Sequence, residues 1–234
     1  MSLQKTQNST LPQNPWLILA LICLPVFIGS LDLTVVSAFL PEVIIRLELP
    51  LQTGLDDAAW ILSGYLLAYT IGLTFMGRVS DLVGRRKVYI ACLLIFLVGS
   101  VLVAEVDPDA RQGVAGLIYN LLYRFQGERP DPGGVALLTI IIGRVIQALG
   151  AGALVPVSLA LVGDLFYART SGAGLIGAID TAGWSAGHLY GGIFVQIFPD
   201  WRWLFWVNVP DADWIGRCRL VAAWCPTEHR QRSL

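Results

Sequence analysis

Long apolar stretches dominate this chain of 234 residues and constrain its fold more than any other feature. A helix that crosses the hydrocarbon core of a bilayer needs roughly 20 mostly apolar residues. Five stretches reach or approach that length: residues 16–40, 58–76, 88–104, 135–162 and 175–198. Because backbone groups in lipid must bond within their own segment, we expect an all-α integral membrane protein with five transmembrane helices.

The composition also favours a membrane protein. Hydrophobic residues make up 55% of the chain and charged residues 14%, whereas soluble domains carry about a quarter charged residues. The formal net charge of −1 gives no reason to expect a nucleic-acid partner. The sequence contains no Walker phosphate loop, nucleophile triad or dinucleotide-binding glycine motif, so we expect neither an enzyme nor a cofactor. The expected surroundings are the lipid bilayer.

The connector between the second and third stretches indicates the orientation. Arg78, Arg85, Arg86 and Lys87 lie within ten residues, and Lys and Arg concentrate in cytoplasmic loops. With this connector inside, the N-terminal segment 1–15 is cytoplasmic as well. We therefore expect a multi-pass protein of the cell membrane whose N-terminus is cytoplasmic.

Residues 105–134 are long for a link between neighbouring helices. Their ends are polar and turn-rich, but residues 114–125 are apolar and aromatic at near-helical spacing. This pattern predicts a short interfacial helix outside the membrane, with a re-entrant segment as the alternative.

The aromatic side chains after the fifth stretch predict a second interfacial feature, a belt at the membrane surface. They are Trp201, Trp203, Phe205 and Trp206.

The charged connector carries a pattern more specific than a cationic anchor needs. Its glycine, arginine and acidic positions are Gly77, Arg78, Asp81, Gly84, Arg85 and Arg86. Gly77 and Gly84 are expected to allow a tight reversal, and the four-residue spacing predicts that Asp81 and Arg85 pair. The pattern resembles the loop between helices 2 and 3 of the major facilitator superfamily. In that family the acidic residue, here Asp81, helps to latch the two halves of the transporter in the outward-facing state.

Further stretches extend the resemblance, and they follow one another along the chain in the order of the family's motifs. Residues 31–41 resemble the first-helix motif of the drug/proton antiporters with fourteen helices. Residues 143–154 resemble their fourth-helix motif, with Ala148 in place of the first glycine. Residues 174–192 match their helix-5 antiporter motif, and residues 201–210 are similar to the exterior junction between helices 5 and 6.

The resemblance implies that residues 16–210 form part of an N-terminal facilitator bundle. It implies proton-coupled export of drugs or other small molecules. A facilitator moves two six-helix bundles around a midplane site, so the alternative is a non-transporting fragment or half-module that needs a C-terminal half. Residues 211–234 are polar and do not continue as a sixth apolar helix, which suggests a shifted reading frame or a truncated gene. Cys218, Cys225 and His229 in this tail fit no common zinc spacing, so no metal site is expected.

Two ionisable residues lie deep in apolar stretches. Asp32 and Arg144 are each about nine residues from the exterior end of their stretch, roughly 14 Å at helical rise. Such residues cost at least about 2.5 kcal/mol to insert and usually serve function. Equal depth predicts an ion pair, which either couples transport or only fixes packing. Gln147 shares the helix face of Arg144, as part of a pathway or of ordinary packing.

The resemblance implies that Asp32 contributes to proton or cationic-drug coupling and that Arg144 takes part in proton exchange. A low-dielectric cavity raises the pKa of a carboxylate, while a nearby guanidinium lowers it. We therefore expect that helix movements that change the separation of Asp32 and Arg144 make Asp32 take and release a proton.

The fifth stretch carries a ridge of small residues. Its motif positions are Gly174, Gly183, Gly187, His188, Gly191 and Gly192. Glycines at every fourth position predict close approach of a second helix. His188 stands where the motif has proline; proline would bend the helix, whereas histidine titrates near neutral pH. His188 is therefore either a pH sensor or a buried, hydrogen-bonded side chain, and Asp180 either lines a cavity or bonds a neighbouring helix.

Overall fold

The computed structural model describes residues 15–49, 54–107, 109, 112–127, 129–165, 169–198 and 200–209. Regular secondary structure in these residues is entirely helical, which confirms the all-α fold. The tail 211–234, which we expect to be polar and atypical, lies outside the described residues, as does segment 1–14.

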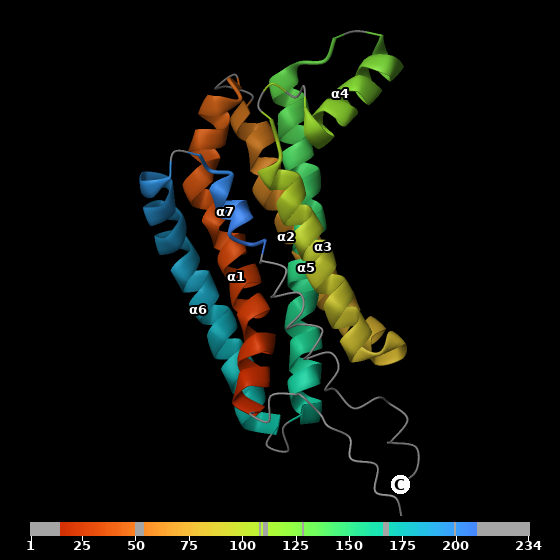
Figure 1. Cartoon of the computed structure of the whole chain (residues 1–234), viewed down its shortest axis with the longest axis vertical. Coiled ribbons are helices and arrows are strands. Elements are labelled where there is room, and N and C mark those ends of the chain that lie inside the picture. Colours follow the sequence, from red (N-terminus) through yellow and green to blue (C-terminus); the bar gives the residue numbers. More distant parts are fainter. Residues whose placement is uncertain are drawn as a thin grey trace, which may run out of the picture.

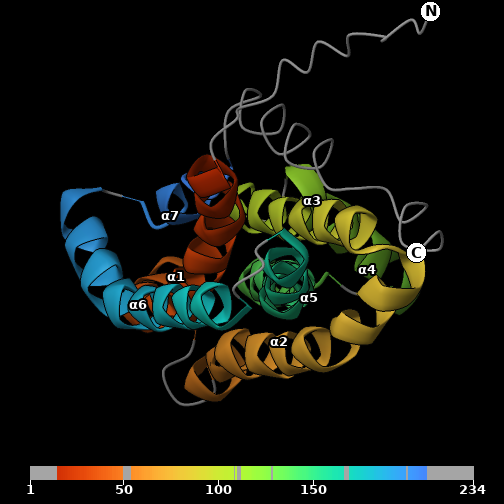
Figure 2. The same ribbon diagram turned by 90° about the horizontal axis from the view of Figure 1, so that it is seen from below.

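The helices form a bundle with α5 at its centre (Figures 1 and 2). Their bounds are α1 Pro15–Arg46, α2 Gly54–Val83, α3 Arg85–Ala104, α4 Gly113–Gln126, α5 Pro132–Leu165, α6 Arg169–Ile197 and α7 Trp203–Trp206. Viewed along its long axis, the bundle places α2 and α3 on two sides of α5, with α1 and α6 side by side on a third (Figure 2). The most extensive helix contacts are those of α5 with α2 and α3 and those of α1 with α6.

Four of the described helical segments are long and apolar enough to cross a membrane. They are Leu19–Arg46, Gly54–Val83, Arg85–Ala104 and Pro132–Gly163. Helix α6 has 29 residues, enough at 1.5 Å per residue to cross a bilayer. It is less apolar because Asp180, Ser185 and His188 interrupt it, so its membrane crossing stays a prediction.

Glycines let α5 approach its neighbours at backbone distance. A Cβ atom added to Gly72 of α2 would lie 2.7 Å from the carbonyl oxygen of Leu149 on α5. A Cβ added to Gly150 of α5 would lie 2.6 Å from the carbonyl oxygen of Cys92 on α3. Neither distance leaves room for a side chain, so these glycines set the separation of the central helices.

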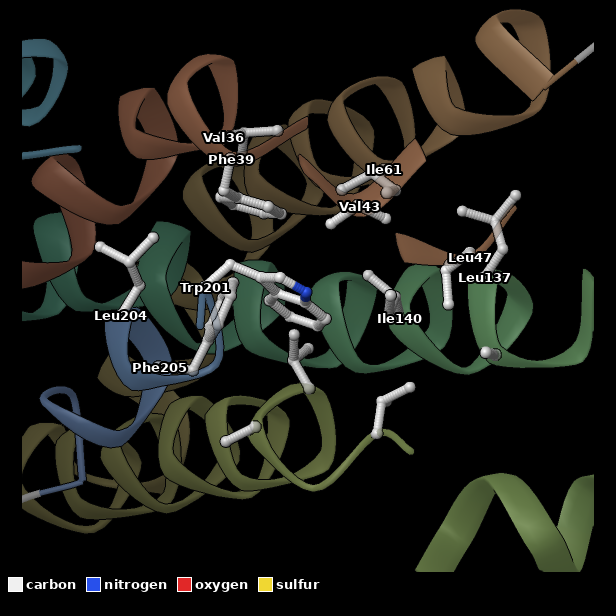
Figure 3. Packing of buried hydrophobic residues seen from close by; sticks show 14 of the residues in the cluster. Val36, Phe39, Val43, Leu47, Ile61, Leu137, Ile140, Trp201, Leu204 and Phe205 are labelled. Atoms are coloured by element: carbon white, nitrogen blue, oxygen red, sulfur yellow. The ribbon is translucent and has the colours of Figure 1, made fainter. Parts of the chain in front are cut away.

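The segment after α6 folds back into one end of the bundle and completes its core (Figure 3). Trp201 stacks on Phe39 of α1 with ring centroids 5.8 Å apart, and Phe205 meets the same ring edge-on at 5.3 Å. Trp201 and Phe205 are buried, while Trp203 and Trp206 are exposed. The expected surface belt is therefore wrong for two of its four members, because the fold-back uses their rings as core.

The charged connector is almost entirely helical. Helix α2 continues to Val83 and α3 begins at Arg85, so the chain reverses at Gly84 alone, which has φ 106°. That left-handed conformation favours glycine. The expectation that Gly77 takes part in the reversal is wrong, because Gly77 lies within α2.

Helix α4 confirms that residues 114–125 are helical. It ends where Gly127 adopts φ 72° and its N–H bonds the carbonyl oxygen of Tyr123. Ala115 is buried, and Ile118, Tyr119 and Leu122 pack against the core cluster that includes Val103 and Val135. One face of α4 is thus attached to the ends of α3 and α5.

Candidate functional site

A buried ion pair joins α1 to α5. Nη1 of Arg144 lies 2.5 Å from Oδ2 of Asp32, and Nη2 donates to the backbone carbonyl of Asp32 at 3.1 Å. Both residues are at most 1% exposed. Equal depth in the two apolar stretches thus brings these side chains together, while their transport roles stay predictions.

Gln147 extends the pair toward α3. Its Oε1 accepts a hydrogen bond from Nη1 of Arg144 at 2.8 Å, and its Nε2 donates to Oγ of Ser100 at 2.8 Å. Ser100 donates in turn to the backbone carbonyl of Phe96 at 3.1 Å. All members of this chain of hydrogen bonds on α5 and α3 are buried, so Gln147 helps to hold the same guanidinium nitrogen, Nη1, that pairs with Asp32.

Three further residues complete the site. Tyr65 belongs to none of the sequence motifs, and Asn208 and Phe205 lie in the 201–210 junction, where Phe205 is expected at the membrane surface. Nδ2 of Asn208, which follows α7, donates to Oδ1 of Asp32 at 3.1 Å. The guanidinium carbon of Arg144 lies 4.0 Å from the ring centroid of Tyr65 and 5.5 Å from that of Phe205. Rings at these distances attract a cation electrostatically. Their recognition needs the tertiary structure because they come from α2 and the α7 segment.

One donor of this site has no partner among the described residues. Nε of Arg144 is buried and makes no hydrogen bond there. A buried donor without a partner costs free energy. The guanidinium therefore keeps an N–H group that a water molecule or a moving polar group can use.

Polar contacts cross the interface of α1 and α6 at successive turns. Oγ of Ser30 donates to Oδ1 of Asp180, and Oγ1 of Thr34 donates to the carbonyl oxygen of Trp184 at 3.2 Å. Ser37 and Nδ1 of His188 lie 3.1 Å apart and share a hydrogen bond. Asp180 therefore bonds a neighbouring helix. His188 is hydrogen-bonded but exposed, so the expectation of a buried side chain is wrong.

The glycines of α6 pack against α1. A Cβ on Gly183 would lie 2.7 Å from the carbonyl oxygen of Phe27, and a Cβ on Gly191 would lie 2.7 Å from Cβ of Ala38. At Gly187 the added atom would overlap Oγ1 of Thr34. The predicted ridge is thus a site of close helix approach. The other two motif glycines, Gly174 and Gly192, meet nothing within 4 Å.

The connector motif lies toward the far end of α5. Oδ1 of Asp81 is 3.0 Å from Nη2 of Arg85, as the four-residue spacing predicts. Nη1 of Arg85 also donates to the carbonyl oxygen of Ala160 on α5 at 3.0 Å. Arg78 is exposed and Arg86 is half-buried. Arg85 therefore ties the reversal to α5, and the latch role of Asp81 stays a prediction.

Among the described residues, no group of three or more His, Cys, Asp or Glu side chains is placed to hold a metal ion. The site itself offers an ion pair, amide and hydroxyl hydrogen bonds and aromatic rings. Such a set can hold and exchange a proton and can respond to a change in charge.

Comparison with known proteins gives one family match and many relatives. The family model described as Major Facilitator Superfamily matches residues 22–210. A probable triacylglyceride transporter of Mycobacterium leprae is 33% identical over 190 residues, which is 80% of this chain and 32% of the relative. A triacylglyceride transporter of Mycobacterium tuberculosis is 34% identical over the same coverage.

A third relative comes from a fungus. An MFS-type transporter of the acurin A biosynthesis cluster of Aspergillus aculeatus is 32% identical over 200 residues, 84% of this chain and 30% of the relative. The chain thus spans about a third of the length of these curated relatives.

Proposed function

Because the chain belongs to the major facilitator superfamily, we propose that it is part of a transporter that exports drugs or other small molecules in exchange for protons. The buried pair of Asp32 and Arg144 carries this proposal. A carboxylate at this depth in a membrane protein marks a proton or ion pathway by default. We also propose a cell-membrane location with a cytoplasmic N-terminus, on the basis of the cationic connector.

In the proposed cycle, Asp32 binds and releases the proton. Protonation removes the negative charge and weakens the bond to Arg144, so α1 and α5 gain freedom to move. Gln147 and the ring of Tyr65 still hold the guanidinium when Asp32 is neutral. Arg144 therefore stays in position and favours release of the proton when α1 returns.

Two substrate classes are candidates. The antiporter-like motifs favour a drug or another small molecule. The mycobacterial relatives, named as triacylglyceride transporters, favour a lipid instead. A transport assay with one substrate of each class distinguishes these candidates.

A second candidate is a membrane half-module that transports nothing until it binds a C-terminal half. The exposed face of α6 favours it, since this face carries the ionisable side chain of His188 beside the hydroxyl groups of Thr181 and Ser185, and ionisable side chains are costly to place in lipid. A water-filled cavity between two bundles gives these side chains a suitable environment. Asp81 would then latch the two halves.

The test uses purified chain in vesicles that contain a pH-sensitive dye. A proton gradient is imposed, a lipophilic cationic dye or a fluorescent triacylglyceride is supplied, and both fluxes are followed. We expect coupled fluxes that Asp32→Asn abolishes and that Glu42→Gln leaves intact. Glu42 is the matched control because it also lies on α1 but forms an exposed ion pair with Arg46.

Three results separate the proposals. Coupled fluxes with the chain alone support the exporter. Fluxes that appear only after co-expression with the C-terminal part of a relative support the half-module. Substrate flux that continues unchanged in Asp32→Asn contradicts the role of Asp32 in either assembly.

A further inference from the structure

Helix α4 has an apolar stripe that the bundle does not cover. The stripe consists of Leu117, Leu121 and Phe125, which are 70%, 56% and 81% exposed. Residues four apart lie on one side of a helix, so the three side chains form a strip that runs to the C-terminal end of α4. Large apolar side chains aligned in this way mark an interaction surface.

The remaining residues divide the circumference of α4 into three faces. Ala115, Ile118, Tyr119 and Leu122 pack on the bundle. The apolar stripe lies next to them, and Asn120 and Arg124 form an exposed polar edge on its other side. At about 100° per residue, the faces follow one another as protein, apolar and polar. This order is that of a helix lying at a boundary between oil and water beside a protein.

The position of α4 fits the same boundary. The helix lies between the end of α3 at Ala104 and the start of α5 at Pro132, two segments apolar enough to span a membrane. Figure 1 shows α4 lying obliquely beside the upper part of α5. In that part of α5, Leu138 and Ile142 are each 40% exposed and lie one turn apart. Exposed apolar side chains thus occur both on α4 and on the part of the spanning helix α5 near it.

We propose that the stripe of Leu117, Leu121 and Phe125 docks on the lipid surface at this end of the bundle. The three side chains enter the boundary between headgroups and acyl chains, while Asn120 and Arg124 remain in water. Interfacial helices bury their apolar face by about 5–10 Å. Helix α4 thus acts as an interfacial helix that fixes how deeply the adjoining ends of α3 and α5 sit in the bilayer.

The first test measures which side chains meet lipid. Spin labels are placed by Leu121→Cys, Phe125→Cys and the control variants Asn120→Cys and Arg124→Cys, in a background whose four cysteines are replaced by alanine. The labelled chain is reconstituted in phosphatidylcholine and phosphatidylglycerol vesicles. Collision with oxygen reports lipid, and collision with a water-soluble nickel complex reports water.

We expect labels at 121 and 125 to favour oxygen over nickel several-fold more than labels at 120 and 124. Equal nickel access at 121 and 120 would place the stripe in water and overturn the proposal. Low access to both reagents at 121 would show that protein covers the stripe, which also overturns it.

A second measurement needs no substitution. The chain of natural sequence is reconstituted with phosphatidylcholine that carries a diazirine near the top of one acyl chain, illuminated and digested with trypsin. The peptide 112–124 holds Leu117 and Leu121. The peptide 125–144 holds Phe125 of the stripe as well as Leu138 and Ile142, so fragment sequencing separates adducts on Leu138 and Ile142, the positive control, from adducts on Phe125. Lipid adducts on both peptides support the proposal. Adducts on Leu138 or Ile142 with none on 112–124 or on Phe125 contradict it, whatever the transport assays show.

Discussion

Asn208 and Arg144 bind different oxygens of the same carboxylate. Nδ2 of Asn208 donates to Oδ1 of Asp32 at 3.1 Å, and Nη1 of Arg144 lies 2.5 Å from Oδ2. Asp32 belongs to α1, Arg144 to α5 and Asn208 to the segment after α7. The charge on one side chain therefore holds three separate parts of the chain together.

Replacement of Asn208 by leucine should destabilise the bundle. The variant loses a hydrogen bond to a charged group, worth about 1.5–3 kcal/mol, and keeps an apolar side chain of similar size. Unfolding of the purified chain by dodecyl sulfate in mixed micelles, followed by circular dichroism, measures the change. Asn120→Leu is the control, because this exposed position on α4 should change the unfolding free energy by no more than about 0.5 kcal/mol. Equal decreases in unfolding free energy for the two variants would show that the hydrogen bond from Asn208 to Asp32 does not stabilise the bundle.

The same chemical change at two aspartates should have different costs. Asp32→Asn leaves Arg144 buried without its counter-charge, which costs about 3–5 kcal/mol. Asp81→Asn breaks a pair whose carboxylate is 58% exposed, and exposed pairs of this spacing contribute about 0.3–0.5 kcal/mol. The same unfolding assay compares the two variants. A large loss for Asp81→Asn would mean that the connector motif stabilises this bundle by itself rather than serving contacts outside it.

Two glycines of the helix-5 motif should respond oppositely to an added methyl group. Gly187→Ala forces α6 away from Thr34 on α1, and overpacking of this kind costs about 1–3 kcal/mol. Gly192→Ala meets no atom within 4 Å and removes a poor helix former, so it should be neutral or stabilising by up to about 1 kcal/mol. The unfolding free energies of the two variants, each compared with that of the natural sequence, test this prediction. Similar values would contradict the close approach of α1 and α6 at Gly187.

Proline at position 188 should be tolerated better than proline in an ordinary helix interior. The N–H of residue 188 normally bonds the carbonyl of Trp184, and a proline there removes this bond at a total cost of about 3 kcal/mol or more. Oγ1 of Thr34 already donates to the same carbonyl at 3.2 Å. His188→Pro should therefore cost less than about 3 kcal/mol, because the carbonyl oxygen keeps a donor.

A double-mutant cycle checks this explanation. Thr34→Val removes the hydroxyl while keeping the shape of the side chain, so it should make His188→Pro more costly by about 1 kcal/mol. Strict additivity of the two substitutions would show that Thr34 gives no support to a proline at this position.

The length of the apolar stretches was enough to predict that the helices exist, but it did not predict where they end. The stretch 58–76 predicts the apolar part of α2, which extends from Gly54 to Val83. The extra turns mix apolar residues with Asp56, Asp57, Arg78 and Asp81, and such mixed turns at the end of a membrane helix give no clear hydropathy signal. The reversal depends on the positive φ of Gly84, and the sequence offers Gly77 as an equal candidate.

The site was predictable only where depth in a helix is informative. Asp32 and Arg144 could be paired because each lies about nine residues from the exterior end of its apolar stretch. Asn208 and Ser100 could not be found in this way, since each needs a fold-back or a helix rotation that places it beside the pair. Their residue types are common at helix interfaces, so no local pattern distinguishes them from packing residues.

The central position of α5 has a consequence for the order of events during synthesis. Helices α2 and α3 pack mainly on α5 rather than on each other, and the partner charge of Asp32 comes 112 residues later in the chain. At a translation rate of about 5–20 residues per second, Asp32 waits roughly 6–22 s for Arg144 after its own synthesis. During that interval the insertion machinery or a bound proton must accommodate the unpaired carboxylate. Insertion of α5 ends this interval, because it brings Arg144 to Asp32.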